Sequence, residues 1–359
     1  MRTPRFASIT LLMLGVASAS ACGGAAARPV PPVSAAPAPL GPLASLLPDG
    51  ARLVVVAHPA QLFDTAAVPR IVDALVLPGG LDRFALRTGV DPRRLTEAVY
   101  AEYDGGVSLI LVRGPIDAEL VVAEAGERMS TVESSADAPL VRRAGFFSDE
   151  RRELVALAGD VVAVTGGPAV VELAALLACV TSSPRHCRGA FAGADAAALL
   201  RAHGLAPLSF YAPTGVTLPE GFGTASLLAG TRSLSVVVDP TEATAAGGSP
   251  GEAVLVVDLA LRGRFPSGAE ENFRALLQSL GESDLGGVVG LRQAAEHLST
   301  QRDQAGLQLH TTVAVASLVH GLQVLFAGEI SAIIDVPAVS PGLSPTSRPE
   351  VGSTIENHK

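Results

Sequence analysis

The side chains of this sequence that could carry chemistry are scattered and do not form a known catalytic pattern. None of the seven histidines lies four residues from another, and the H-E-x-x-H pattern of zinc proteases does not occur. Lys359 is the only lysine, which excludes Schiff-base chemistry, a P-loop lysine and Ser–Lys nucleophile pairs from the folded region. The sequence therefore predicts no catalytic residues, no cofactor and no metal.

Cys179, His186 and Cys187 come nearest to a metal site. A spacing of eight residues between the cysteines, with one adjacent histidine, is a weak zinc pattern. The alternative is a disulfide between Cys179 and Cys187, with His186 facing solvent beside it. The segment between the cysteines is rich in turn-forming residues and could close easily, and the sequence favours the disulfide. Two unpaired buried thiols are the remaining alternative.

Other histidines follow or lie within predicted strands. His58 comes directly after an apolar strand at 53–57, where a functional loop could begin, although Pro59 is equally suited to open a helix. His297 and His310 could be cross-strand neighbours. If they are, the pattern favours a polar sheet face over a pair of metal ligands.

The first residues have the three zones of a secretory signal. Arg2 and Arg5 precede an apolar stretch at 7–17, which is too short for a membrane-spanning helix, and small residues follow it. The sequence predicts a signal peptide at residues 1–21.

Cys22 follows this signal directly, and Ala19-Ser20-Ala21-Cys22 resembles the bacterial lipobox, although the motif usually has Leu at the position of Ala19. The resemblance implies a lipid on Cys22, and the absence of Asp after it implies no retention at the inner membrane. Acylation of Cys22 would also leave an even pair of cysteines in an oxidising compartment. The alternative is ordinary cleavage at the A-x-A site, which would give a soluble periplasmic or secreted protein.

Composition limits the partners of the chain. The formal net charge is -9, and no basic cluster is present that could bind nucleic-acid phosphates. Aromatic residues make up 4% and tryptophan is absent, which argues against stacking platforms for bases or sugars. The sequence predicts no nucleic-acid partner.

Proline, alanine and glycine define the ends of the folded part. Residues 22–48 are predicted to be the lipidated cysteine and an Ala/Pro-rich tether, and residues 338–359 a disordered tail. The intervening chain divides into a first α+β half at 49–190 and a second at 191–337.

Both halves show the order β-α-β-β-α, which indicates an internal duplication. The fold class expected is α+β, in two related halves of largely antiparallel sheet with helices packed on one face. In the first half, strands are predicted at 107–113, 140–148, 152–158 and 161–165, with helices at 115–125 and 169–178. In the second half, strands are predicted at 253–262, 294–302 and 307–316, with helices at 268–280 and 318–330.

Two local patterns in the second half are specific. Ser267 and Glu270 match a helix capping box, and Gly281 is placed to end that helix. The strand at 307–316 alternates, with leucine, threonine and valine on one face and Gln308, His310 and Thr312 on the other, which predicts a sheet with one face at least partly polar.

The lipobox-like residues, the tether and the duplicated body together resemble exported lipoproteins of unknown function from GC-rich, myxobacterium-like proteobacteria. The resemblance implies an outer-membrane lipoprotein facing the periplasm, and it transfers no catalytic residues. Our leading hypothesis is a non-enzymatic protein with a binding or scaffolding surface for an envelope partner. The alternatives are a carrier of an apolar ligand and a hydrolase with a non-standard site.

Overall fold

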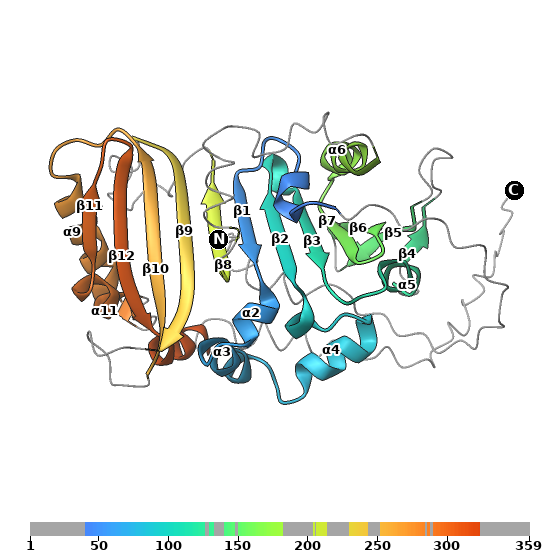
Figure 1. Ribbon diagram of the computed structural model, residues 1–359, viewed down its shortest axis with the longest axis horizontal. Coiled ribbons are helices and arrows are strands. Elements are labelled where there is room, and N and C mark those ends of the chain that lie inside the picture. The colour runs from blue at the N-terminus through green and yellow to red at the C-terminus, as the bar shows by residue number, and fades with distance from the viewer. Residues whose placement is uncertain are drawn as a thin grey trace, which may run out of the picture.

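Antiparallel strands form one continuous sheet in the computed structural model (Figure 1). The structure describes residues 40–125, 129–132, 140–147, 150–181, 204, 206–213, 230–242, 252–283, 286–287 and 290–323. Within these residues the sheet has 12 strands, in the order β11-β12-β10-β9-β8-β1-β2-β3-β7-β6-β5-β4.

The strands divide between the two halves of the chain. Those of the first half are β1 (Leu53–Ala57), β2 (Glu97–Glu102), β3 (Ser108–Arg113), β4 (Met129–Thr131), β5 (Arg142–Phe147), β6 (Glu150–Ala158) and β7 (Val161–Gly166). Those of the second half are β8 (Leu208–Ala212), β9 (Thr231–Glu242), β10 (Ala253–Gly263), β11 (Ser299–Arg302) and β12 (Gly306–Ala314).

Most of the helices lie in the connections between strands. They are η1 (Leu43–Leu46), α2 (Pro59–Phe63), α3 (Ala67–Leu75), α4 (Gly80–Thr88), η2 (Pro92–Arg94), η3 (Asp104–Gly106), α5 (Ala118–Ala123), α6 (Val170–Thr181), α9 (Ala269–Glu282) and α11 (Leu291–Glu296). A further helical stretch covers residues 315–323.

The two halves follow the same path and meet at their first strands. In each half three successive strands lie side by side, a helical connection follows, and the last strand returns to pair with the third, as β7 does with β3 and β12 with β10. Strands β1 and β8 pair antiparallel, with Val54 opposite Tyr211 and Val56 opposite Ser209. The α+β class and the large antiparallel sheet are therefore confirmed.

Helices cover both faces of the sheet in the first half, which differs from the expected arrangement on one face. Buried side chains of η1 and α6 pack with Val99, Leu109 and Leu111 on one face. Buried side chains of α5 pack with Tyr100 and Ile110 on the other. The physical reason is that β2, β3 and β7 are continuous apolar runs, which need cover on both sides.

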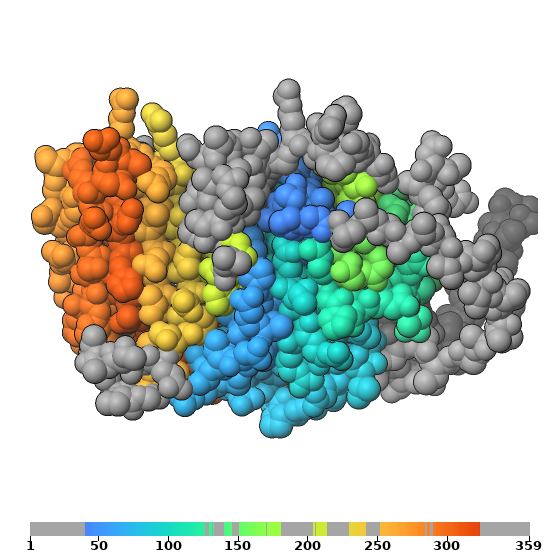
Figure 2. All heavy atoms as spheres, viewed as in Figure 1, coloured from blue at the N-terminus to red at the C-terminus, as the bar shows by residue number. Residues whose placement is uncertain are grey.

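The second half is covered mainly on one face. Phe273 of α9 and Leu298, which follows α11, pack with Leu261, Leu307 and Leu309 of β10 and β12. Helices α9 and α11 lie behind the strands in the view of Figure 1. The other face, which carries His310 and its neighbours in register, is visible at the molecular surface in Figure 2 over β9, β10 and β12.

Three local predictions in the second half are wrong. The strand expected at 294–302 begins only at Ser299, because residues 291–296 are good helix formers and form α11. No capping box forms: the N-cap of α9 is Gly268, at φ 82°, without a side-chain cap. Helix α9 also continues through Gly281, which has another use. A Cβ there would lie 2.7 Å from the Arg292 backbone, so glycine allows α9 and α11 to pack closely.

Residues 40–48, assigned from the sequence to the tether, belong to the folded body. Leu43 and Leu46 of η1 and the following Leu47 are buried in the core. The Tyr103 hydroxyl, whose pKa is raised by burial, donates to the carbonyl of Pro48 at 3.2 Å. The domain limits at 21/22, 190/191 and 337/338 lie outside the described residues.

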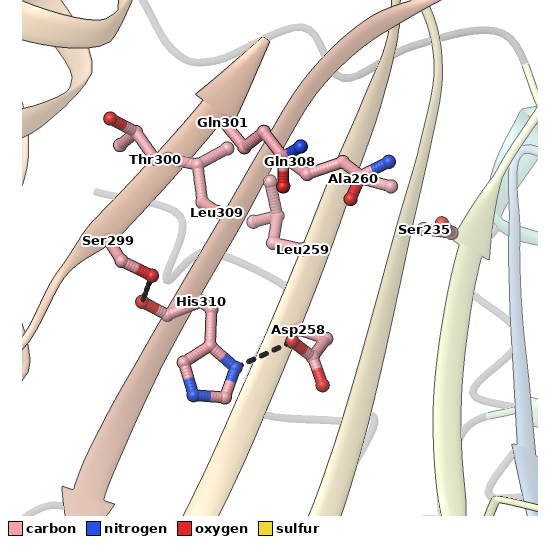
Figure 3. Close-up of a pocket in the computed structure, with 10 residues that line it drawn as sticks. All are labelled: Ser235, Asp258, Leu259, Ala260, Ser299, Thr300, Gln301, Gln308, Leu309 and His310. Carbon is pink, nitrogen blue, oxygen red and sulfur yellow. Dashed lines mark hydrogen bonds and ion pairs between the residues drawn. The ribbon is translucent and has the colours of Figure 1, made fainter. Parts of the chain in front are cut away.

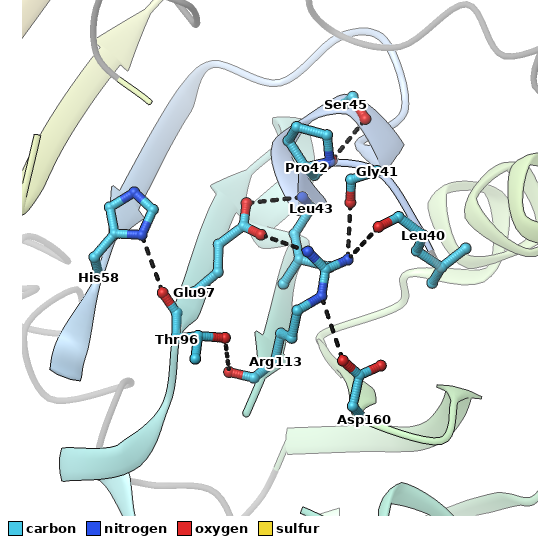
Figure 4. Close-up of polar contacts among 10 residues, drawn as sticks. All are labelled: Leu40, Gly41, Pro42, Leu43, Ser45, His58, Thr96, Glu97, Arg113 and Asp160. Carbon is cyan, nitrogen blue, oxygen red and sulfur yellow. Dashed lines mark hydrogen bonds and ion pairs between the residues drawn. The ribbon is translucent and has the colours of Figure 1, made fainter. Parts of the chain in front are cut away.

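A partly buried ion pair fastens this segment to the sheet (Figure 4). Arg113 Nη1 lies 3.0 Å from Glu97 Oε2, and its Nη2 donates to the carbonyls of Leu40 and Gly41 at 2.9 and 2.8 Å. Glu97 Oε1 accepts from the backbone N–H of Leu43 at 2.8 Å. The two charged side chains therefore satisfy three backbone groups of the segment.

We expect Arg113→Ala to lower the free energy of unfolding by about 2–4 kcal/mol, because it leaves the buried Glu97 carboxylate without its cation and frees two carbonyls. Urea denaturation followed by circular dichroism measures this change. The matched control is Arg52→Ala, which breaks an exposed ion pair with Asp104 and should cost less than about 0.5 kcal/mol. Equal effects of the two substitutions would contradict the role of the buried pair.

Candidate functional site

A row of polar side chains crosses the open face of the second half. His310 on β12 lies directly opposite Asp258 on β10 and Ser299 on β11, so the register places all three on one face. His310 Nδ1 is 2.7 Å from Asp258 Oδ1, and the Ser299 hydroxyl donates to the carbonyl of His310 at 3.5 Å (Figure 3). The Nδ1–Asp258 contact leaves His310 Nε2 available to a ligand.

A second row of side chains lies on the same face, two residues from the first row along each strand. Gln308 is opposite Gln301 on one side and Ala260 on the other, and Ala260 is opposite Ser235 of β9. The two rows line a half-open hollow of about 640 Å³, a size within the usual range of ligand sites. Because Ala260 and Ser235 are small, the floor of the hollow lies lower than its glutamine and histidine rim.

Ser235 is the most unusual residue of this hollow. It is only 2% exposed, and its Oγ has no hydrogen-bond partner within the part of the chain that the structure describes. Leaving a buried hydroxyl unsatisfied costs about 1–3 kcal/mol. A native protein usually avoids that cost, so a buried hydroxyl of this kind at the floor of a hollow is available to a ligand or to water.

The turn between β11 and β12 fixes one side of the rim. Asp303 accepts hydrogen bonds from the backbone N–H groups of Ala305 and Gly306, both at 2.7 Å, and from Gln308 Nε2 at 3.2 Å. The pKa of the Asp303 carboxyl is lowered, most by the Ala305 bond and further by Gly306, Arg262 and Gln308. Gln308 is thus held by the turn, whereas the side chain of Gln301 makes no hydrogen bond among the described residues.

The Asp258–His310–Ser299 row has the residue types of a hydrolase triad, but its geometry does not favour catalysis. In such a triad the acid is buried and the histidine receives the serine proton. Here the Asp258 and His310 side chains are 59% and 52% exposed, and Ser299 donates to a backbone carbonyl instead of the imidazole. The row is better suited to holding a ligand than to activating a nucleophile.

The histidines singled out from the sequence have separate positions. His310 lies on a polar sheet face, as predicted, whereas His297 is the C-cap of α11 and is not its cross-strand partner. His58 is the N-cap of α2, as expected from Pro59, and its Nδ1 lies 3.0 Å from the carbonyl of Thr96.

The cysteine predictions are not tested by the described residues. Cys179 lies on α6, and Cys187 and His186 lie outside the described part of the chain. Cys22 and the signal peptide at 1–21 also lie outside it. The disulfide and the lipid therefore stay predictions.

Sequence reasoning missed Asp258, which lies within an apolar strand, and Ser235, whose mixed strand β9 it does not predict; only the strand register brings them to the open face. It also missed a G-x-S-x-G match at 247–251, outside the described residues. A nucleophile elbow connects a strand to a helix. Strands β9 and β10, antiparallel neighbours, flank this match instead.

The described ranges hold neither a cluster of metal-ligating side chains nor a helix that could span a membrane. No three His, Cys, Asp or Glu side chains there gather closely enough to hold a metal ion. No helix in that part of the chain has the length and hydrophobicity needed to span a bilayer.

Comparison with known proteins gives one distant structural likeness. No protein-family model and no curated protein sequence matches this chain. A solved structure, described as crystal form I of TP0453, is similar to 80% of this chain and covers 98% of its own length, with 10% sequence identity and a TM-score of 0.42.

If the row is a binding surface and not a structural element, its charges should contribute little to folding. We expect Asp258→Asn to change the free energy of unfolding by less than about 1 kcal/mol, because the pair is more than half exposed. Urea denaturation at neutral pH measures this change. A loss of several kcal/mol would show that Asp258 is needed to build the sheet.

Proposed function

We propose that this chain is a non-enzymatic lipoprotein of the bacterial cell envelope that binds a partner or ligand on the open sheet face of its second half. The observation that carries the proposal is the contrast between the halves. Within the described residues the first half is covered on both faces, whereas one face of the second half has Asp258, His310 and Gln301 exposed around a hollow. An antiparallel sheet commonly leaves one polar face in water, so it is the hollow in this face, with the buried Ser235 hydroxyl at its floor, that suggests a binding role.

The N-terminal attachment supports an anchored body. The chain becomes part of the core at Leu40–Leu47, so a lipid on Cys22 would be joined to it through residues 23–39. At about 3.1 Å per residue for a proline-rich chain, this spacer would allow roughly 50 Å between lipid and body. That reach would let the open face meet a partner away from the membrane surface.

The geometry favours binding over the two alternatives. A carrier of an apolar ligand needs an apolar cavity, and the hollow has serine, glutamine, aspartate and histidine on its rim and floor. A hydrolase needs an activated nucleophile, and Ser299 does not face the imidazole of His310. The described part of the first half offers neither an apolar cavity nor an activated nucleophile on this face, because η1 and α6 pack against its strands.

Intact mass spectrometry of the protein from membranes tests the anchor. We expect a chain that begins at Cys22 and carries a diacylglyceryl group, and we expect Cys22→Ser to release the protein into the soluble fraction. Alkylation before and after reduction also tests the Cys179–Cys187 bridge. An unlipidated chain starting at Cys22 would contradict the anchor and leave a soluble exported protein.

Site-specific photocrosslinking in cells tests the open face. A photoreactive amino acid in place of Asp239, which is exposed and shares a face with Asp258, should give crosslinks to a discrete partner. The matched control is the same amino acid in place of Glu271, exposed on α9. Crosslinks from both positions alike, or from neither, would contradict a binding role for this face.

A further inference from the structure

The hollow above Ser235 has the chemistry of a specific ligand site, and we propose that it binds an uncharged saccharide. This inference rests on the proposed function and names the class of ligand for that face. Three groups on two sides of the hollow offer hydrogen bonds that the described chain does not use: Ser235 Oγ, the Gln301 carboxamide and His310 Nε2.

The Ser235 hydroxyl is the anchor of the proposal. It is almost fully buried, lines the hollow and has no partner within the described residues. Alanine would fill the same space without an unsatisfied polar atom, so serine costs stability here. A ligand that exchanges a hydrogen bond with Oγ would remove that cost on binding.

The charge of the lining excludes strongly ionic ligands. Among the described residues that line the hollow, Asp258 is the one carboxylate and lies against His310, and none is an arginine or a lysine. An anion would meet Asp258 without a balancing guanidinium, and a cation would meet a single acid already hydrogen-bonded to imidazole. An uncharged ligand meets neither penalty.

The donors and acceptors match the hydroxyl and amide groups of a saccharide. The Gln301 carboxamide both donates and accepts, a serine hydroxyl does the same, and the second oxygen of Asp258 accepts. Ser235 and Gln301 are three strands apart in the row, about 14 Å, so they would meet different sugar units of one saccharide, whose C–H surfaces can lie on the Ala260 floor. Because none of the described lining residues is aromatic, we expect weak binding, with dissociation constants of about 0.1–1 mM.

Calorimetry and saturation-transfer NMR on the purified mature chain test the site, with N,N′-diacetylchitobiose and cellobiose as neutral probes and glucuronate as the anionic comparison. We expect a neutral disaccharide to bind and glucuronate not to bind. Ser235→Ala should weaken binding by about tenfold, the usual effect of losing one buried hydrogen bond. The same substitution should raise the urea midpoint, because it removes an unsatisfied hydroxyl.

Two further variants make the result specific. Gln301→Ala changes an exposed side chain on the rim and should weaken binding several-fold while the protein stays folded. Ser209→Ala is the matched control, because Ser209 is also a buried serine on this face but does not line the hollow. It should leave saccharide binding unchanged.

The outcomes separate this inference from the proposed function. The saccharide site would be overturned if neither neutral disaccharide binds at about 10 mM, ten times the weakest dissociation constant expected. A Ser235→Ala variant that binds as well as the parent would overturn it too. A Ser235→Ala variant with a lower urea midpoint would show that the hydroxyl is structural, and would also overturn it. Crosslinks from position 239 without saccharide binding would leave the proposed function standing with a protein partner.

Discussion

The pairing of β1 with β8 is the contact on which the arrangement of the molecule depends. Each half is a meander whose third strand pairs with its last, and the halves become one sheet only where Val54–Ala57 meet Leu208–Tyr211. The hydrogen bond from the backbone N–H of His58 to the carbonyl of Pro207, at 2.8 Å, extends this contact beyond the strands. Through it, the polar face of the second half continues the covered face of the first.

That continuity explains why one face can be core at one end and an exposed polar surface at the other. From Val56 to Ser209 and on to Val237 and Asp258, one row of side chains runs across the sheet. It begins beneath η1 and ends at the open surface. The first half therefore supplies a rigid, doubly covered support, and the second half can keep an exposed polar surface without losing its position.

The sequence predicts much of this molecule because its strongest signals are local. The alternation of Gln308, His310 and Thr312 identifies a polar face before any pairing is known. It does not identify Asp258, which lies in a mostly apolar strand, or Ser235, which lies in a strand of mixed composition, because only the register of β9, β10 and β12 brings them to one face.

Packing against distant elements overrides local signals elsewhere. The leucines of residues 43–47 are core residues although proline and alanine surround them in the sequence, because Glu97 and Arg113 hold the segment in place. Gly281 is typical of the residue that ends a helix, but α9 continues through it, and its lack of a side chain allows the close approach of α11. The central strand β1 also imposes an order on folding: until residue 208 has been synthesised, its Val54–Ala57 edge has no partner, and this apolar edge is an aggregation hazard while the rest of the chain is being made.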